Sequence, residues 1–265
     1  MMKTEYMHQL PTEIKINGQA LTIAEVLAVA RHFAPVTLGD DSIQRIRVAR
    51  AVIQSIADEG RKVYGVTTGF GHLSRVRIKH EQLVDLQHNL LRSHSAGVGE
   101  PLSEEVTRAM MLLLAASLAR GNSGVRVEVV QLLLQMLNAG FYPIIPSRGS
   151  VGASGDLAPL AHLALTLIGE GEAAFHGKRY TGAEALQLAS LTPLQLQAKE
   201  GLALINGTHM MEAIAVLAIA DAESLLLTAE VACAMSIEGL MGSHMPLDPR
   251  IHALRGQVGQ QESAA

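Results

Sequence analysis

Residues 209–240 form an almost uninterrupted apolar run, and this run constrains the fold more than any other feature of the sequence. Glu212, Asp221, Glu223 and Glu230 interrupt it. Because apolar side chains would lie on nearly every face of a helix formed here, that helix must be surrounded by other helices. The sequence after the run is mainly polar, so we expect those partners to come from an oligomer or from a larger protein of which this chain is a part.

The composition also favours helices. Aromatic residues make up 3% of the 265 residues and tryptophan is absent, while alanine and leucine dominate the apolar positions. Sheets, in contrast, are enriched in β-branched and aromatic side chains. We predict a mainly α protein with short N-terminal β-hairpins and, at the C-terminal end, the start of a long-helix bundle. The predicted domains are residues 1–195 and residues 196–265.

Charge and cysteine content exclude several classes of protein. The net charge is −4 and the basic residues are scattered, so we expect no nucleic-acid surface. The apolar run between Arg108 and Arg120 is shorter than the roughly 20 residues that cross a bilayer, so we expect no membrane partner. The single cysteine, Cys233, excludes an internal disulfide, and the N-terminal sequence lacks a secretory signal. The protein is therefore expected to be cytoplasmic.

Local signals predict individual elements. Asn17-Gly18, between two short alternating runs, predicts an N-terminal hairpin, and the sequence "AAFHGKRY" predicts a second one. Thr22 with Glu25, and Thr181 with Glu184, form capping boxes that start helices. Further helices are expected at residues 42–58, 80–92, 103–119, 125–138 and 209–240, and from an N-cap at Asp156 to about Ile168.

The segment "GSVGASGDLAPLAH", Gly149–His162, places three glycines and an isolated serine ahead of one of these helices. Ser154 is followed directly by Gly155, which excludes the spacing of a serine hydrolase elbow, and no Gly-Lys-Ser/Thr of a phosphate-binding loop is present. Two interpretations remain from spacing alone. The glycines form a plain helix cap, or they permit a tight turn in which the Gly155 amide nitrogen attacks the Ala153 carbonyl carbon. Loss of water from the ring and from Ser154 would then leave a carbon electrophile.

This segment resembles throughout the signature of the histidine and aromatic amino acid ammonia-lyases, in which Ala-Ser-Gly cyclises to 4-methylidene-imidazol-5-one (MIO). The blocks "VYGVTTGFG", "NLLRSHSAGVGEPL", "KEGLALINGT" and "DPRIHALRGQVGQ" extend the resemblance in the family's order. The resemblance implies that Ala153-Ser154-Gly155 forms MIO as the cofactor, with Asp156 and Gly152 supporting its formation, and that neither a metal ion nor pyridoxal phosphate is used. It also implies a homotetramer whose active sites draw residues from several subunits.

Tyr64 matches the family's tyrosine on a mobile loop over the active site, which acts in proton transfer. A tyrosine has a pKa near 10, so nearby amide dipoles or positive charge would have to lower this pKa for Tyr64 to act as a base at neutral pH. Without the resemblance, a tyrosine beside a glycine-rich loop is more often a packing residue.

The resemblance places His94, Ser93, Asn206 and Gly71 in the substrate pocket. Ser93-His94 is typical of the histidine-processing members, whereas plant phenylalanine enzymes tend to carry Phe-Leu there. His209 differs, because histidine-processing members more often have glutamine at this position. As local structure, His94 would be a partner for a helix C-terminus and Asn206 a cap that interrupts a helix.

The expected reaction of the full-length protein is the non-oxidative elimination of ammonia from L-histidine to give trans-urocanate. This chain by itself is expected to be inactive, because the family's second tyrosine, its carboxylate-binding arginine and its glutamate are absent from it. Two alternatives stay open. The protein is a tyrosine or phenylalanine ammonia-lyase or aminomutase of the same family, or it is a truncated, non-catalytic helical oligomerisation module.

Overall fold

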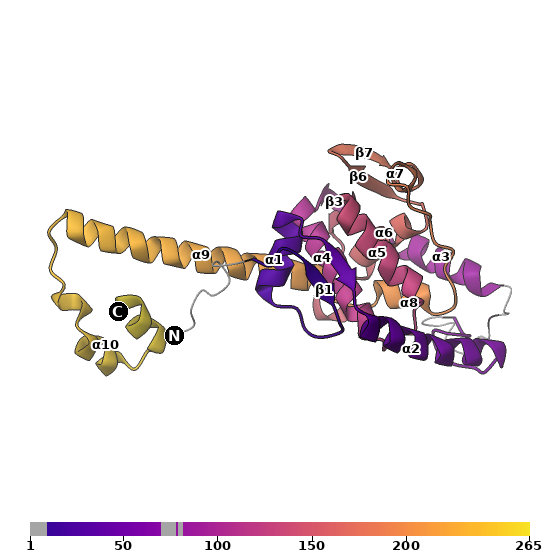
Figure 1. Ribbon diagram of the computed structural model, residues 1–265, viewed down its shortest axis with the longest axis horizontal. Helices are drawn as coiled ribbons and strands as arrows, with labels where there is room; N and C mark the ends of the chain where they lie inside the picture. Colours follow the sequence, from indigo (N-terminus) through magenta and orange to yellow (C-terminus); the bar gives the residue numbers. More distant parts are fainter. Residues whose placement is uncertain (1–9, 70–77, 79–81) are drawn as a thin grey trace. The chain divides into compact units, whose positions relative to one another are not determined.

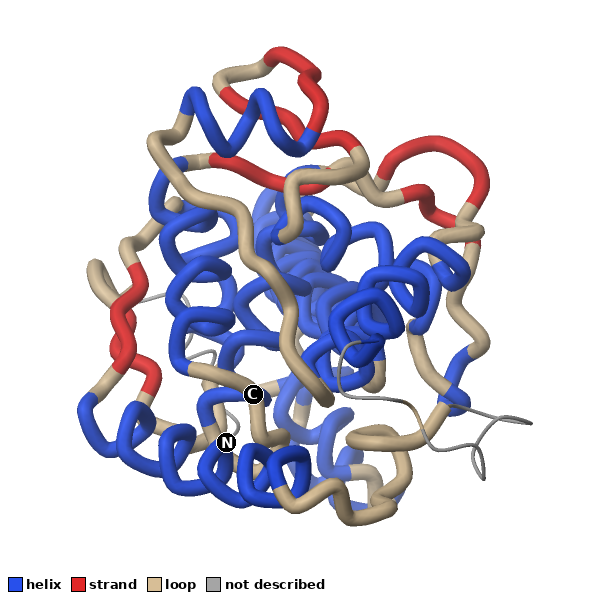
Figure 2. The backbone as a smooth tube through the Cα atoms, turned by 90° about the vertical axis from the view of Figure 1, so that its right-hand side faces the viewer, coloured by secondary structure: helices blue, strands red, loops and turns tan. Residues whose placement is uncertain are grey.

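The computed structural model describes residues 10–69, 78 and 82–265. These residues separate into two compact units, one extending to Val216 and the other comprising Leu217–Ala265. In the first unit helices predominate and the strands are short segments at the periphery of the helices (Figures 1 and 2). The predicted mainly α fold is therefore confirmed.

The helices of the first unit are α1 (Ile23–His32), α2 (Asp40–Asp58), α3 (Leu83–His94), α4 (Glu104–Ala119), α5 (Val127–Ala139), α6 (Leu157–Leu167), α7 (Gly182–Leu188) and α8 (Glu200–Ile205). Its strands are β1 (Ile14–Ile16), β2 (Val36–Leu38), β3 (Val98–Pro101), β4 (Phe141–Pro143), β5 (Pro146–Arg148), β6 (Glu172–Phe175) and β7 (Lys178–Thr181). The long apolar run forms the predicted helix, α9 (His209–Gly239), whose first residues belong to this unit.

The hairpin predicted around Asn17-Gly18 is wrong. β1 pairs in parallel with β2, with Ile14 opposite Val36. The chain does turn at Gly18, which has a φ of +82°. However, the capping box of Thr22 starts α1 at once, so no residues are left for a returning strand. α1 then acts as the crossover that parallel strands require.

Three other local predictions are confirmed: the second hairpin, the two capping boxes and the glycine at the end of α5. β6 and β7 pair antiparallel as the second hairpin, with Phe175 opposite Lys178. Both capping boxes form, at the starts of α1 and α7. α5 ends at Gly140, which has a φ of +70°, a left-handed conformation that glycine adopts without steric cost. These signals act within a few residues, so the local sequence is sufficient to predict them.

α4 forms the centre of the core, with α1 and α5 packed against it (Figure 1). Its fully buried apolar side chains include Met110, Met111, Leu112 and Leu114. Arg108 on the same helix is only 1% exposed. A charged side chain in this position requires hydrogen-bond partners, because burial without them is costly.

Arg108 finds these partners at the ends of two other helices. Its Nε and Nη2 donate to the Val29 carbonyl at 3.1 and 3.0 Å, and its Nη1 donates to the Leu137 carbonyl at 3.1 Å. Both carbonyls lie in the last turns of their helices, α1 and α5, where the helix dipole is negative, and the Leu137 carbonyl also accepts the Gly140 N–H at 3.2 Å. The Phe33 ring stacks on the guanidinium, with 4.2 Å between Cζ and the ring centroid. One buried cation therefore joins α4 to the C-terminal ends of α1 and α5.

The second unit contains the rest of α9, with α10 (Pro249–Arg255) and α11 (Val258–Ala264). Ser263 of α11 donates to the Glu230 carboxylate of α9 at 2.5 Å. Large apolar side chains of α9 are exposed here, including Leu225 at 70% and Met235 at 69%. The described helices include none that is long and apolar enough to span a membrane. The exposed surface of α9 agrees with the prediction that this helix requires further helices around it.

We predict that Arg108→Met lowers the free energy of unfolding by about 2–3 kcal/mol, because two buried carbonyl groups lose their charged donor. Urea denaturation at neutral pH measures the change. Arg47→Met, at an exposed position of α2, is the matched control and should change the free energy by less than about 0.5 kcal/mol. Equal stability of Arg108→Met and the unsubstituted protein would contradict the assignment of this interaction.

Candidate active site

The Ala153-Ser154-Gly155 segment forms a tight turn before α6. Gly152–Ser154 is one turn of 3₁₀ helix, in which the Gly155 N–H donates to the Gly152 carbonyl at 2.8 Å. Gly155 is buried with a φ of +114°, and a Cβ on it would lie 2.9 Å from Leu157 Cδ1. Glycine is therefore required at position 155, whereas Ala153 and Ser154 are exposed.

Asp156 does not cap its own helix, contrary to the sequence prediction. It occupies the N-cap position of α6, but its side chain makes no capping hydrogen bond there. Its φ of −98° and ψ of 44° lie outside the extended region that a capping residue normally adopts. In addition, Pro159 occupies the third helical position and has no N–H to offer.

The Asp156 carboxylate caps α9 instead. Its Oδ2 accepts from the backbone N–H groups of Met210 and Met211 at 2.8 and 3.0 Å, and Oδ1 accepts from the Ser150 hydroxyl at 2.5 Å. The Asp156 side chain is fully buried, and its backbone N–H donates to the Gly207 carbonyl at 2.7 Å. The positive end of the α9 dipole thus compensates a buried negative charge. This contact holds the segment from Asn206 to Met211 against the turn at Gly155.

His209 packs behind the same segment. A Cβ on Gly207 would overlap the His209 ring, so glycine is required at 207 as well. His209 is 6% exposed, and its Nδ1 has no hydrogen-bond partner among the described residues. Burial lowers the pKa of His209, against the opposing effect of the Glu212 and Asp156 charges. The shift favours a neutral imidazole.

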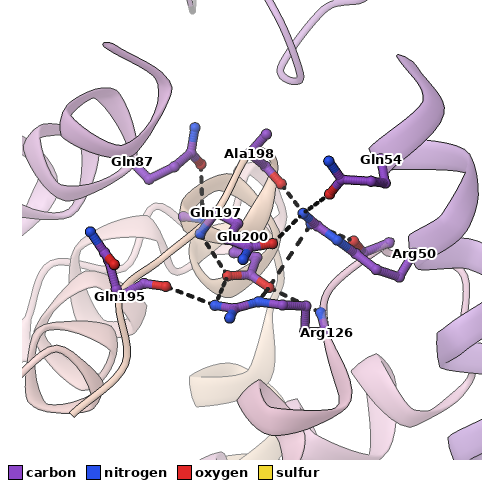
Figure 3. A network of polar contacts seen from close by, with 10 residues as sticks. Arg50, Gln54, Gln87, Arg126, Gln195, Gln197, Ala198 and Glu200 are labelled. Carbon is purple, nitrogen blue, oxygen red and sulfur yellow. Dashed lines mark hydrogen bonds and ion pairs between the residues drawn. The ribbon is translucent and has the colours of Figure 1, made fainter. Parts of the chain in front are cut away.

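Asn206, predicted as a substrate-binding residue, directly follows α8 and is exposed. The start of α8 is held by the buried carboxylate of Glu200 (Figure 3). This carboxylate accepts from the Arg126 backbone N–H at 3.0 Å, from Arg126 Nε and Nη2 at 2.8 Å each, and from the Gln197 N–H at 2.8 Å. Arg50 Nη1 lies 4.0 Å from Glu200 Oε1. The network positions α8, and with it Asn206.

The electrostatics of the two arginines differ although both face Glu200. Hydrogen bonding to Glu200 raises the pKa of Arg126, whereas burial lowers the pKa of Arg50. Arg126 therefore hydrogen-bonds the Glu200 carboxylate directly, whereas Arg50 forms only a longer ion pair with it. Because Arg126 is also the N-cap residue of α5, the network joins α2, α5 and α8.

His94 is the last residue of α3 and is partly buried, while Ser93 is exposed. His94 Nδ1 lies 2.9 Å from the Leu90 carbonyl oxygen and 3.1 Å from Ser93 Oγ. The local interpretation of His94, as a partner for the C-terminal carbonyls of its helix, is thus confirmed. This contact leaves its Nε2 as the nitrogen for any bound ligand.

The chain after His94 contacts the Gly149–His162 segment and the strand that precedes it. The Gly97 N–H donates to His162 Nε2 of α6 at 3.1 Å, and Val98 pairs with Arg148 across β3 and β5. A Cβ on Gly149 would lie 3.3 Å from Gly97 Cα, so the two backbones are close. α3, α6 and α8 also pack on one another. The structure therefore brings the segments that contain His94 and Asn206 to the turn that carries Ser154.

Tyr64 is 57% exposed and lies in the turn Tyr64–Thr67. Val66, two residues after Tyr64, belongs to a cluster with Leu83, Ile56 and Ala198. Leu83 is the first residue of α3 and His94 is the last, about 16 Å further along the helix at 1.5 Å per residue. Val66 thus packs near the end of α3 that is opposite His94. Gly71 lies outside the described residues.

Sequence reasoning missed four residues that position this site: Ser150, Gly207, His162 and Glu200. His162 and Glu200 act through partners distant in the sequence. Ser150 and Gly207 contact residues within six positions, but the sequence analysis assigned no role to these contacts. Glu200 did carry a signal, as an acidic residue directly before the apolar run "GLALI". The described residues contain no group of three or more His, Cys, Asp or Glu side chains that could hold a metal ion.

The chain matches known proteins in sequence and in structure. The family model described as aromatic amino acid lyase matches residues 21–265. The chain is 53% identical over 247 residues to histidine ammonia-lyase of Symbiobacterium thermophilum, covering 93% of this chain and 49% of that protein. The crystal structure of histidine ammonia-lyase from Trypanosoma cruzi matches with a TM-score of 0.88 and 41% identity, over 95% of this chain and 49% of the other.

A second solved structure, Pantoea agglomerans phenylalanine aminomutase, matches with a TM-score of 0.89 and 35% identity, over 95% of this chain and 49% of the other. Similarity of fold therefore does not distinguish a histidine ammonia-lyase from a phenylalanine aminomutase. The chain spans about half the length of the curated relatives it matches.

Protonation of His162 is expected to break the hydrogen bond between the Gly97 N–H and the His162 side chain of α6. Burial lowers the pKa of His162, and only the neutral ring accepts the Gly97 N–H. The folded pKa lies below the unfolded value of about 6.5, so this contribution to stability is complete above about pH 6.5 and is lost as the pH falls through the folded pKa. His162→Gln keeps an acceptor without titrating. Urea denaturation should therefore show a smaller loss of stability on acidification in His162→Gln than in the unsubstituted protein.

The matched control is His32→Gln, which removes one histidine at an exposed position of α1. Part of the acid sensitivity should survive in His162→Gln, because burial also lowers the pKa of His209. An identical loss of stability in His162→Gln and the unsubstituted protein would show that His162 does not contribute.

Proposed function

The chain belongs to the aromatic amino acid lyase family, and from this premise we propose that the whole protein eliminates ammonia from L-histidine to give trans-urocanate. The observation that carries the choice of histidine is the higher identity to histidine ammonia-lyases than to the aminomutase. His94 supports it, since an imidazole at the end of α3 can hydrogen-bond the imidazole of a substrate.

Ala153-Ser154-Gly155 is the proposed precursor of MIO. The turn fits the group, because Gly155 has a backbone conformation that requires glycine and the exposed Ser154 side chain is accessible for loss of water. When formed, MIO supplies an electrophilic carbon that turns the substrate amino group into a better leaving group. Asp156 and Gly152 support the turn, and no metal ion or pyridoxal phosphate enters the proposal.

The other residues bind the substrate and move a proton. Asn206 offers an amide to the substrate or the prosthetic group, and Ser93 and Gly71 belong to the same proposed pocket as His94. Tyr64 is the proposed base that removes the substrate β-hydrogen as a proton. The whole protein is proposed to act as a homotetramer.

The chain by itself is proposed to be inactive. It covers about half of its curated relatives, and both Ser154 and the apolar side chains of α9 are exposed in it. An elimination site must exclude water and position the substrate carboxylate, which requires additional chain. The whole protein is proposed to work in the cytoplasm.

A tyrosine or phenylalanine ammonia-lyase or aminomutase is the second candidate. The similarity in fold to the phenylalanine aminomutase favours keeping it, since the same framework carries that activity. A non-catalytic helical module is the third, and it differs from both in requiring no prosthetic group.

Ring formation is tested by intact-protein mass. We predict that the purified protein is lighter than its sequence by two waters, and that Ser154→Ala abolishes this loss because no hydroxyl remains to be eliminated. Ser147→Ala, on the nearby strand β5, is the control and should retain the full loss. An unmodified mass in the unsubstituted protein would favour the non-catalytic module.

Substrate choice is tested by steady-state kinetics of the whole protein with L-histidine, L-tyrosine and L-phenylalanine. We predict the highest kcat/KM for histidine and the appearance of urocanate absorbance. His94→Phe should lower kcat/KM for histidine by at least about tenfold, because a hydrogen bond to the substrate ring is lost. Preference for an aromatic substrate, or formation of a β-amino acid, would reject the histidine assignment.

A further inference from the structure

Ser150 connects the two ends of the turn that carries Ser154. Its hydroxyl donates to Asp156 Oδ1 at 2.5 Å, and its oxygen accepts the Gly152 N–H at 3.2 Å. Between these two partners lie the residues of the proposed MIO precursor. The Val151 N–H, next to Ser150, donates to the Gly155 carbonyl at 3.2 Å. Three hydrogen bonds thus close the turn: the Ser150 hydroxyl to Asp156, the Gly152 N–H to Ser150, and the Val151 N–H to the Gly155 carbonyl.

The orientation of this hydroxyl is determined by the core. Asp156 is fully buried, and its second carboxylate oxygen is already occupied by the Met210 and Met211 N–H groups. Oδ1 therefore faces the turn, where a short hydrogen bond to a charged acceptor is stronger than a neutral one. With its proton committed to Asp156, Ser150 can only accept from Gly152. The start of α9 therefore positions the Asp156 carboxylate, which orients Ser150, and Ser150 in turn binds the Gly152 backbone.

We propose that Ser150 is a positioning residue for the cyclisation of Ala153-Ser154-Gly155. The inference rests on the proposed function, because it assumes that the ring forms. Cyclisation creates a bond between the Gly155 nitrogen and the Ala153 carbonyl carbon. The Ala153 oxygen leaves as water with the amide hydrogens of Gly155 and Ser154, and the Ser154 hydroxyl leaves as a second water with the Ser154 α-hydrogen.

The rate of such an intramolecular attack depends on how often the two atoms approach in the reactive geometry. In the structure the Gly155 N–H is bonded to the Gly152 carbonyl, so the position of Gly152 determines where the attacking nitrogen lies. Ser150 holds Gly152 from its N–H side. Without the hydroxyl, Gly152 loses this restraint, and its open surroundings provide no steric substitute, since a Cβ there would meet nothing within 4 Å.

The test measures ring formation and not catalysis. The complete chain is made by a pulse of cell-free synthesis, and the fraction of folded molecules lighter by two waters is followed by intact mass over time. Ser150→Ala is expected to slow this conversion by about 10- to 100-fold, the range for a hydrogen bond to a charged group. Ser150→Thr, which keeps the hydroxyl, is expected to convert at nearly the original rate.

Ser55→Ala is the matched control. Ser55 donates to the Glu59 carboxylate at 2.5 Å on the surface of α2, so this variant loses a similar bond far from the turn in sequence. It should convert normally. Should Ser150→Ala fail to fold, Ser150→Val against Ser150→Thr repeats the comparison at constant shape. Urea denaturation confirms that the compared variants are folded.

The outcomes separate the two proposals. Slow conversion in Ser150→Ala or Ser150→Val, with normal conversion in Ser150→Thr and Ser55→Ala, supports the role of Ser150. Equal rates in Ser150→Ala and the unsubstituted chain overturn that role and leave the proposed function intact. Absence of the mass loss from the unsubstituted chain overturns ring formation itself, and with it both proposals.

Discussion

The buried carboxylate of Asp156 is the contact on which the rest of the candidate site depends. It binds the first turn of α9 through two backbone N–H groups and the hydroxyl of Ser150 through its other oxygen. A buried carboxylate is tolerated only when such donors replace water. Here the donors come from two segments, so compensation of the charge also joins them. The Asp156 carboxylate consequently holds the turn before α6 against the segment from Asn206 to the start of α9.

The same principle recurs elsewhere in the first unit. Arg108 satisfies carbonyls at the ends of α1 and α5, and Glu200 satisfies the N-terminus of α5 and the side chain of Arg126. In each case a buried charge pairs with backbone groups at a helix terminus. The aliphatic side chains of α4 supply the area that drives burial, but they are not directional. The buried charges add the direction, because each requires specific donors or acceptors.

Sequence reasoning predicted the elements that short-range chemistry defines. The capping boxes at Thr22 and Thr181, the second hairpin and the long apolar helix are all present. It failed at Asn17-Gly18, where the turn forms but the strand pairs with a segment beyond α1. It failed again at Asp156, which has the residue type and position of an N-cap but serves another helix. Both errors came from assigning a local partner to a group whose partner is distant.

The sequence by itself therefore determined that this chain is mainly helical, where most helices begin and end, and which segment resembles an ammonia-lyase signature. These conclusions depend on residues within one or two turns of each other, or on a motif that is contiguous. Only the tertiary structure decided that Asp156 caps α9, that Ser150 restrains Gly152, and that Gly97 binds His162. The Asp156 partners are 54 and 55 residues away, and which helix arrives there is settled by packing of the whole core. The buried Asp156 carboxylate accepts hydrogen bonds from whichever N–H groups the packing of the core brings next to it.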